Sequence, residues 1–257
     1  MIFNEPASFS DIIGLLASLV FFVIAAVYDL RIREVPDKVW LMYGLIGLGL
    51  IALRLYSGLE SIYLIAISIV LSVILSLVMA HLGVFGGADA KAMICLSLAL
   101  PLVPVGFRYV VVWFLVPFFP LVILTLGYLL SFSLSLFFAL RNICGYLRYG
   151  SSMFDGFHDE SFVKKIFVVL TGYRCNPEML KAARFLYPME HVVTGKDGLR
   201  RRFDLSFSIA DEKDASLSSY LEALPSVGNP SMIWVTPGLP MIVFFLLAVI
   251  TVVAANL

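Results

Sequence analysis

The sequence predicts an all-α polytopic membrane bundle of six transmembrane helices with a small cytoplasmic α+β domain. Hydrophobic residues make up 61% of the 257 residues and charged residues only 14%, which is far more apolar than an ordinary soluble domain. Six stretches are long and apolar enough to be spans, and one charged segment separates the last two. Basic and acidic residues number 18 each, so net charge gives no argument for a nucleic-acid partner.

Each predicted span contains roughly 20 mostly apolar residues. The spans cover residues 12–29, 39–56, 61–82, 90–107, 109–140 and 232–255. The fifth is too long for one perpendicular crossing and contains Pro117 and Pro120, so we expect it to be kinked, tilted or extended beyond the membrane. Trp234 and Pro237 open the sixth and predict an interfacial anchor followed by a flexible entry.

The distribution of Lys and Arg predicts the orientation, because basic residues accumulate in cytoplasmic loops. Placing the segment after span one in the cytoplasm leaves only Arg54 and Arg108 of the 18 basic residues outside. Six spans then put both the N-terminus and the C-terminus outside. The sequence thus predicts a multi-pass protein of the cell (plasma) membrane.

Most charged residues lie between spans five and six, in residues 141–231, which are predicted to form the cytoplasmic domain. Residues 1–140 and 232–257 are predicted to form the membrane bundle. The three cysteines lie far apart and form no Cys-x-x-Cys pair, which argues against a zinc module, a redox motif or a disulfide framework. No cofactor and no metal are predicted.

Within the charged segment, helical spacing and alternation predict a few short elements. Apolar residues recur at helical spacing over Pro177–Leu186. Two alternating stretches, 191–194 and 202–207, flank a Gly195–Gly198 turn and indicate a hairpin. A further short helix is predicted over Asp214–Leu224.

Two aspartates are placed at the cytoplasmic edge of the predicted bundle. Asp29 follows the apolar run of span one, and Asp89 lies in a glycine-rich turn between spans three and four. Because two spans separate them, both are expected on the same side. Each also has a structural alternative: Asp29 as an acid that ends its helix beside Arg31 and Arg33, and Asp89 as the N-cap of span four. Two close carboxyl groups share a proton, so a pair could hydrolyse a peptide bond by acid and base catalysis.

The segments around these aspartates resemble those of a known family. YDLRIREVPD at 28–37 and GGADAK at 86–91 are similar to motifs of the aspartic membrane peptidases of the Gly-x-Gly-Asp type, most closely the archaeal preflagellin and prepilin peptidases. Ala88 stands where the family has its second glycine. The resemblance implies that Asp29 and Asp89 are the catalytic pair. The residues taken to bind substrate or shape the site are Gly86, Gly87, Ala88 and Lys91.

The resemblance implies a membrane aspartic endopeptidase that removes the short basic leader of preflagellin-like or prepilin-like precursors at the cytoplasmic face. Its partners would be those protein substrates, with class III signal peptides, and the lipid bilayer, with no nucleic acid; the oligomeric state is left open. The leader could meet Asp155, Asp159 and Glu160. Two alternatives are a proton- or cation-coupled transporter, which should carry acids near the bilayer midplane, and a non-catalytic filament assembly factor.

Overall fold

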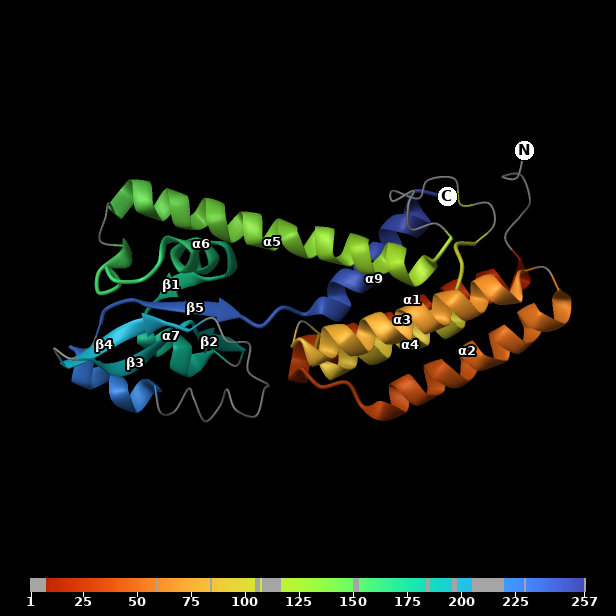
Figure 1. Cartoon of the computed structure of the whole chain (residues 1–257), viewed down its shortest axis with the longest axis horizontal. Helices are drawn as coiled ribbons and strands as arrows, with labels where there is room; N and C mark the ends of the chain where they lie inside the picture. Colours follow the sequence, from red (N-terminus) through yellow and green to blue (C-terminus); the bar gives the residue numbers. More distant parts are fainter. Residues whose placement is uncertain are drawn as a thin grey trace. The chain divides into compact units, whose positions relative to one another are not determined.

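The structure is a computed structural model that describes residues 8–58, 60–83, 85–104, 107, 117–149, 153–183, 185–195, 198–204, 220–228 and 230–256. The chain divides into two compact units, whose elements are labelled in Figure 1. Unit 1 contains Met1–Ser131 and Pro240–Leu257, and unit 2 contains Phe132–Leu239.

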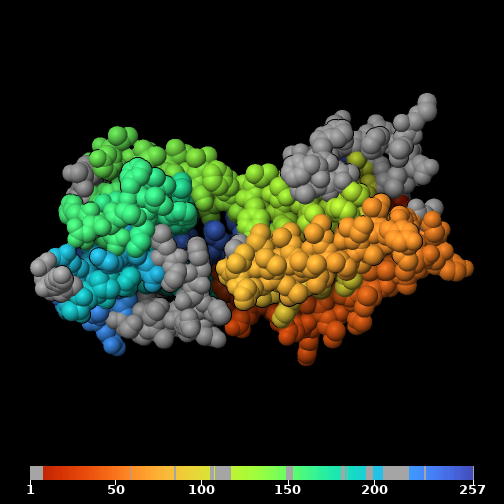
Figure 2. Space-filling model, in the orientation of Figure 1, coloured from red at the N-terminus to blue at the C-terminus, as the bar shows by residue number. Residues whose placement is uncertain are grey.

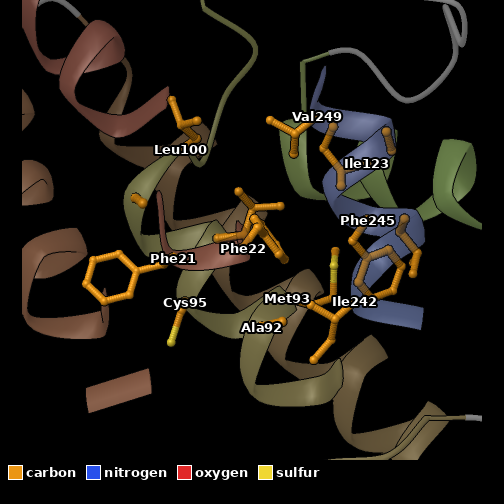
Figure 3. Close-up of a cluster of buried hydrophobic side chains, with 14 of the residues drawn as sticks. Phe21, Phe22, Ala92, Met93, Cys95, Leu100, Ile123, Ile242, Phe245 and Val249 are labelled. Atoms are coloured by element: carbon orange, nitrogen blue, oxygen red, sulfur yellow. The ribbon is translucent and has the colours of Figure 1, made fainter. Parts of the chain in front are cut away.

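Unit 1 is a helical bundle built around a short central helix, α4, which packs against α1, α2, α3 and α9. Figure 3 shows its core, in which Phe22 of α1, Met93 of α4 and Phe245 of α9 are buried. The helices are α1 (Phe9–Ile32), α2 (Asp37–Ser57), α3 (Ile62–His81), α4 (Gly87–Ala99), the first part of α5 (Phe119–Tyr149) and α9 (Met241–Ala254).

The membrane character of the chain is confirmed, but the predicted count of six spans is not. Among the described residues, four helices are long and apolar enough to cross a membrane: α1, α2, α3 and α5. Their outward side chains are apolar; Ile74 on α3, for example, is 54% exposed. Figure 2 shows α2 and α3, in orange, at the surface of unit 1. An apolar surface of this kind is typical of helices solvated by lipid.

Two predicted spans are shorter helices than expected. The helix of span four ends at Ala99 rather than at residue 107, because Pro101 disfavours helical geometry at the residue before it. The helix of span six begins at Met241, because Ile233–Pro237 forms strand β5 instead. The prolines of span five do not kink a helix: α5 begins at Phe119, and Pro120 lies in its first turn, where proline is tolerated.

Glycines allow α4 to lie close to its neighbours. A Cβ at Gly14 of α1 would come within 2.7 Å of the carbonyl oxygen of Ala99, and a Cβ at Gly47 of α2 would come within 2.7 Å of the Leu98 Cβ. Such contacts let helix backbones approach closely in a membrane bundle. The start of α1 therefore packs against the end of α4, so the two helices are antiparallel.

Two buried charged side chains and a partly buried third one meet at the start of α1. Arg54 of α2 is 1% exposed; its Nη2 lies 3.2 Å from Asp11 Oδ1, and its Nε lies 3.3 Å from Glu60 Oε1. The same Nη2 donates to the Ser10 carbonyl at 3.3 Å. This ion cluster joins the beginning of α1 to the end of α2 and to the α2–α3 loop. Arg54 is thus a buried structural cation.

Unit 2 combines helices with antiparallel strands, as predicted for the charged domain. A three-stranded sheet has the order β1-β5-β2, and a separate hairpin pairs β3 with β4, with Gly195 opposite Gly198. The predicted hairpin is therefore confirmed, but its second strand covers residues 198–203 rather than 202–207. Residues 196–197 and 205–207 lie outside the described part. The elements are α6 (Phe162–Thr171), β1 (Tyr173–Cys175), α7 (Pro177–Ala182), β2 (Leu186–Pro188), β3 (Glu190–Gly195), β4 (Gly198–Phe203), η3 (Leu224–Val227) and β5 (Ile233–Pro237).

Tertiary packing changes two details of the prediction for these segments. The helix expected to reach Leu186 ends at Ala182, because Leu186 opens β2 and pairs with Pro237 of β5. Trp234 is not an interfacial anchor: it is 1% exposed and its ring stacks on Phe154 at 5.6 Å. Most of the helix predicted over 214–224 lies outside the described residues.

A buried acid fixes the hairpin to the rest of unit 2. Glu190 is 2% exposed; it pairs with Arg201 Nη2 at 2.7 Å and accepts the Tyr220 hydroxyl at 2.6 Å. Burial raises the pKa of Glu190, and its two partners offset part of that rise. The network provides the hydrogen bonds that a buried carboxylate requires.

Candidate active site

Asp29 lies in the last turn of α1. It is 9% exposed, so its carboxyl group faces the bundle rather than the lipid. The helix ends at Ile32, and the next residue, Arg33, adopts left-handed geometry with φ 60° and donates its backbone N–H to the Asp29 carbonyl at 3.2 Å. This geometry is unusual for a residue other than glycine. It turns the chain so that Arg33 Nη1 lies 3.9 Å from Asp29 Oδ1.

Asp89 lies in the first turn of α4, three residues after the N-cap residue, Gly86. The Gly86 backbone N–H donates to Asp89 Oδ2 at 3.0 Å. A carboxylate at this position satisfies a free N–H and interacts favourably with the positive end of the helix dipole. Asp89 is therefore not the N-cap itself, although it does help to begin the helix.

The two aspartates occupy the same end of unit 1. The antiparallel packing of α1 and α4 brings the last turn of one beside the first turn of the other. The charges of both Asp29 and Arg33 act on the Asp89 carboxyl group. Two acids and one guanidinium thus share a local electrostatic environment, and burial strengthens the interaction between them.

A tyrosine that the sequence analysis missed lies near Asp89. Tyr128 of α5 is close enough for Asp89 to influence it electrostatically, and its ring stacks on Phe85 at 6.0 Å, nearly parallel at 5°. Its buried hydroxyl has no hydrogen-bond partner within the part of the chain that the structure describes. Nothing in the sequence marks this residue except that it is a hydroxyl-bearing side chain within a long apolar stretch.

The predicted glycines differ in their surroundings. A Cβ at Gly86 would lie 3.2 Å from Asp89 Oδ2, whereas a Cβ at Gly87 would meet nothing within 4 Å. Neither has a positive φ, and Ala88 lies within the regular helix α4. Alanine at the place of the family's second glycine is therefore compatible with the backbone.

Lys91 forms an ion pair with a residue other than Asp29 and Asp89. Its Nζ forms an ion pair with Asp37 Oδ1, at the first position of α2. Both side chains are exposed, so this pair is expected to contribute little stability. Its position joins the beginning of α4 to the beginning of α2, next to the segment that follows Asp29.

Comparison with known protein families decides the identity of the chain. Residues 16–144, half of the chain, match the family described as the type IV leader peptidase family, peptidase A24. The chain belongs to the type IV leader peptidase family. A second match, to the archaeal peptidase A24 C-terminus of type II, covers residues 164–255 of this peptidase. A search of curated proteins gave no match.

Membership establishes the coarse activity: the protein is an aspartic-type membrane peptidase, and its family cleaves leader peptides of prepilin-like precursors. The matched range contains Asp29 and Asp89. Family membership favours a peptidase over the transporter alternative. Among the described residues of this A24 peptidase, no three His, Cys, Asp or Glu side chains gather as metal ligands.

Two of the three acidic residues suggested for leader binding, Asp159 and Glu160, are engaged in contacts inside unit 2 of the peptidase. Asp159 Oδ2 pairs with Arg200 Nη1 at 2.9 Å. Glu160 pairs with Lys164 Nζ at 3.1 Å and accepts the Phe203 backbone N–H at 3.3 Å. These contacts support a structural role for the two acids within the domain.

Proposed function

We propose that this peptidase removes the short basic leader of prepilin-like or preflagellin-like precursors at the cytoplasmic face, and that Asp29 and Asp89 jointly activate the attacking water. The observation that carries the proposal is the placement of the two acids at one end of unit 1, in the last turn of α1 and in the first turn of the antiparallel helix α4. One carboxyl group accepts a proton from water, and the other donates a proton to the peptide carbonyl or to the leaving amine. The pair titrates as a unit.

The charge distribution supports the proposed orientation. Placing the end of α1 and the beginning of α4 at the cytoplasmic face also places Arg31, Arg33 and Lys91 there, in agreement with the positive-inside rule. The substrate's apolar helix would then pack within the membrane while its basic leader remains on the cytoplasmic side. The scissile bond between them would lie near the bilayer edge, at the depth proposed for both acids.

Incubation of the purified protein in lipid with a precursor tests this function. The precursor should carry a short basic leader followed by an apolar helix. Loss of the leader, seen as a size shift and as a new N-terminus by mass spectrometry, would support the proposal. A precursor bound by the protein but left at full length would instead support the filament assembly factor.

The two glycines before Asp89 provide a matched pair of substitutions. Gly86→Ala would place a methyl group 3.2 Å from Asp89 Oδ2, so we expect it to displace the carboxyl group and to lower kcat by about 10-fold or more. Gly87→Ala meets open space in the free protein. We expect Gly87→Ala to raise KM and to leave kcat nearly unchanged, if the substrate backbone passes over this position. Steady-state cleavage kinetics give kcat and KM for both variants. Equal effects of the two substitutions on kcat would contradict these different roles for Gly86 and Gly87.

Tyr128 is proposed to donate its hydroxyl hydrogen bond to the substrate near the aspartates. Tyr128→Phe should lower kcat/KM by about 10-fold, equivalent to one hydrogen bond of about 1.4 kcal/mol. The free energy of unfolding of the Tyr128→Phe variant should not fall, because the Tyr128 hydroxyl has no hydrogen-bond partner among the described residues of the free protein.

Tyr43→Phe is the matched control for Tyr128→Phe. The buried Tyr43 hydroxyl donates to Ser18 Oγ at 2.7 Å, so its loss should lower the free energy of unfolding by about 1 kcal/mol and leave cleavage unchanged. Thermal unfolding in detergent and the cleavage assay separate the two outcomes. A stability loss without a kinetic effect in Tyr128→Phe would remove this tyrosine from the site.

A further inference from the structure

Helix α6 of unit 2 exposes a face made of large apolar side chains. Their exposed fractions are 77% for Phe162, 61% for Val163, 42% for Ile166 and 51% for Phe167. Residues at these spacings lie on one side of a helix, and we refer to these four as the apolar face of α6. The α6 segment, green to blue-green in Figure 2, reaches the surface on the side shown. A contiguous exposed apolar face of this kind marks an interaction site.

The two lysines of α6 contact other parts of unit 2. Lys164 Nζ pairs with Glu160 at 3.1 Å and donates to the Phe203 carbonyl at 3.2 Å. Lys165 Nζ lies 5.7 Å from the centre of the Phe154 ring. A surface helix of a water-soluble domain carries charged rather than large apolar side chains on its outer side. The orientation of α6 therefore indicates an apolar environment outside the domain.

The helix that holds α6 is itself part of an apolar span. Asn142 of α5 donates its side-chain amide to the carbonyls of Val169 and Gly172, at 2.8 and 2.7 Å, and so fixes the C-terminal end of α6. Helix α5 is one of the four candidate membrane helices. Exposed apolar side chains continue along α5 within unit 2: Phe132, Leu136, Phe137, Leu140, Ile143 and Leu147. The apolar face of α6 thus belongs to the same unit as an apolar stripe of a membrane helix.

We propose that the apolar face of α6 lies in the interfacial layer of the lipid bilayer, with the helix parallel to the membrane plane. At 1.5 Å per residue, the ten residues of α6 extend about 15 Å, which is too short to cross a hydrocarbon core of about 30 Å. A short amphipathic helix with aromatic residues on its apolar side suits the boundary between headgroups and acyl chains. This contact would hold the soluble domain against the membrane.

The size of the apolar face favours lipid over a second copy of the chain. A stable protein interface buries about 800 Å² on each partner. A helix about 15 Å long and about 10 Å wide presents one face that is far smaller than this. A lipid surface needs no such minimum area on this helix, because α5 already anchors the unit.

Spin labels on the full-length protein in vesicles test the proposal. Single cysteines replace Phe162 or Ile166, with Met179→Cys of α7 as the water-exposed control and Ile74→Cys of α3 as the lipid-exposed reference; Met179 is 55% exposed and Ile74 is 54% exposed. Exposed Cys144 is replaced by Ser in all of them. Vesicles of phosphatidylethanolamine and phosphatidylglycerol are probed with oxygen, which concentrates in lipid, and with a water-soluble nickel chelate.

Spin labels at positions 162 and 166 should be more accessible to oxygen than to the nickel chelate, as at position 74. The label at position 179 should be more accessible to the chelate. Two results would overturn the proposal. One is chelate accessibility at 162 and 166 equal to that at 179, which would place the face in water. The other is low accessibility to both probes, which would indicate a protein partner. All four positions are exposed, so the substitutions should leave the fold intact, and the outcome does not depend on catalytic activity.

Discussion

Replacement of Asp29 or Asp89 by Asn is expected to abolish precursor cleavage while folding and membrane insertion are retained. Each side chain keeps its size but loses the ability to exchange a proton, and general acid or base catalysis typically contributes about 10²-fold to 10⁴-fold. Because the two acids are proposed to act on one water molecule, the double variant should be no slower than the slower single variant. Single-turnover cleavage of a leader-bearing precursor by each purified variant measures these rates.

Asp159→Asn is the matched control for the aspartate variants. It removes one carboxylate from an exposed ion pair with Arg200 and should leave the cleavage rate unchanged. Near-normal processing by Asp29→Asn or Asp89→Asn would remove that residue from the mechanism. Independent, multiplicative losses in the double variant would contradict a joint action on water.

Arg54→Ala is expected to be the most damaging single substitution for the stability of unit 1. It would leave the buried Asp11 and the partly buried Glu60 without their cation, and breaking a buried ion pair from one side costs about 3 to 5 kcal/mol. A bundle held by a net stability of about 5 to 15 kcal/mol would lose a large part of it. Thermal unfolding of the protein in detergent should show a correspondingly lower midpoint.

Two comparisons distinguish the effect of burial from that of simple charge loss. Arg200→Ala breaks an exposed pair with Asp159 and should cost at most about 1 kcal/mol. Adding Asp11→Asn and Glu60→Gln to Arg54→Ala removes the uncompensated acids and should recover part of the loss. If Arg54→Ala cost no more than Arg200→Ala, the buried cluster would not be a stabilising feature.

Composition and local patterns were sufficient for much of the architecture. Lipid-facing helices need long apolar runs, and such runs can be read directly from the sequence. The β3–β4 hairpin was also predictable, because alternation and a glycine turn are local signals. The same is true of the candidate pair: an even number of intervening spans fixes the relative side of Asp29 and Asp89 without any knowledge of packing. Their catalytic role stays a prediction.

Features that depend on distant partners were not predictable. The apolar residues 233–237 look like the start of a span, but their backbone pairs with β1 and β2 in unit 2. Tyr128 is a candidate site residue only because the fold brings α5 close to Phe85 and Asp89, which lie far from Tyr128 in the sequence. Phe162 is exposed because the rest of unit 2 packs against the other side of α6, and the sequence does not reveal which side that is.

The sequence by itself determined that the chain lies in a membrane and which residues could form its helices, and it predicted that two acids lie at one edge. Only the tertiary structure decided where α4 and α9 begin and end, which apolar residues form a strand, and which side chains surround Asp89. Hydrophobicity and turn chemistry are properties of neighbouring residues, whereas burial, strand pairing and electrostatic contact arise between residues that only folding brings together.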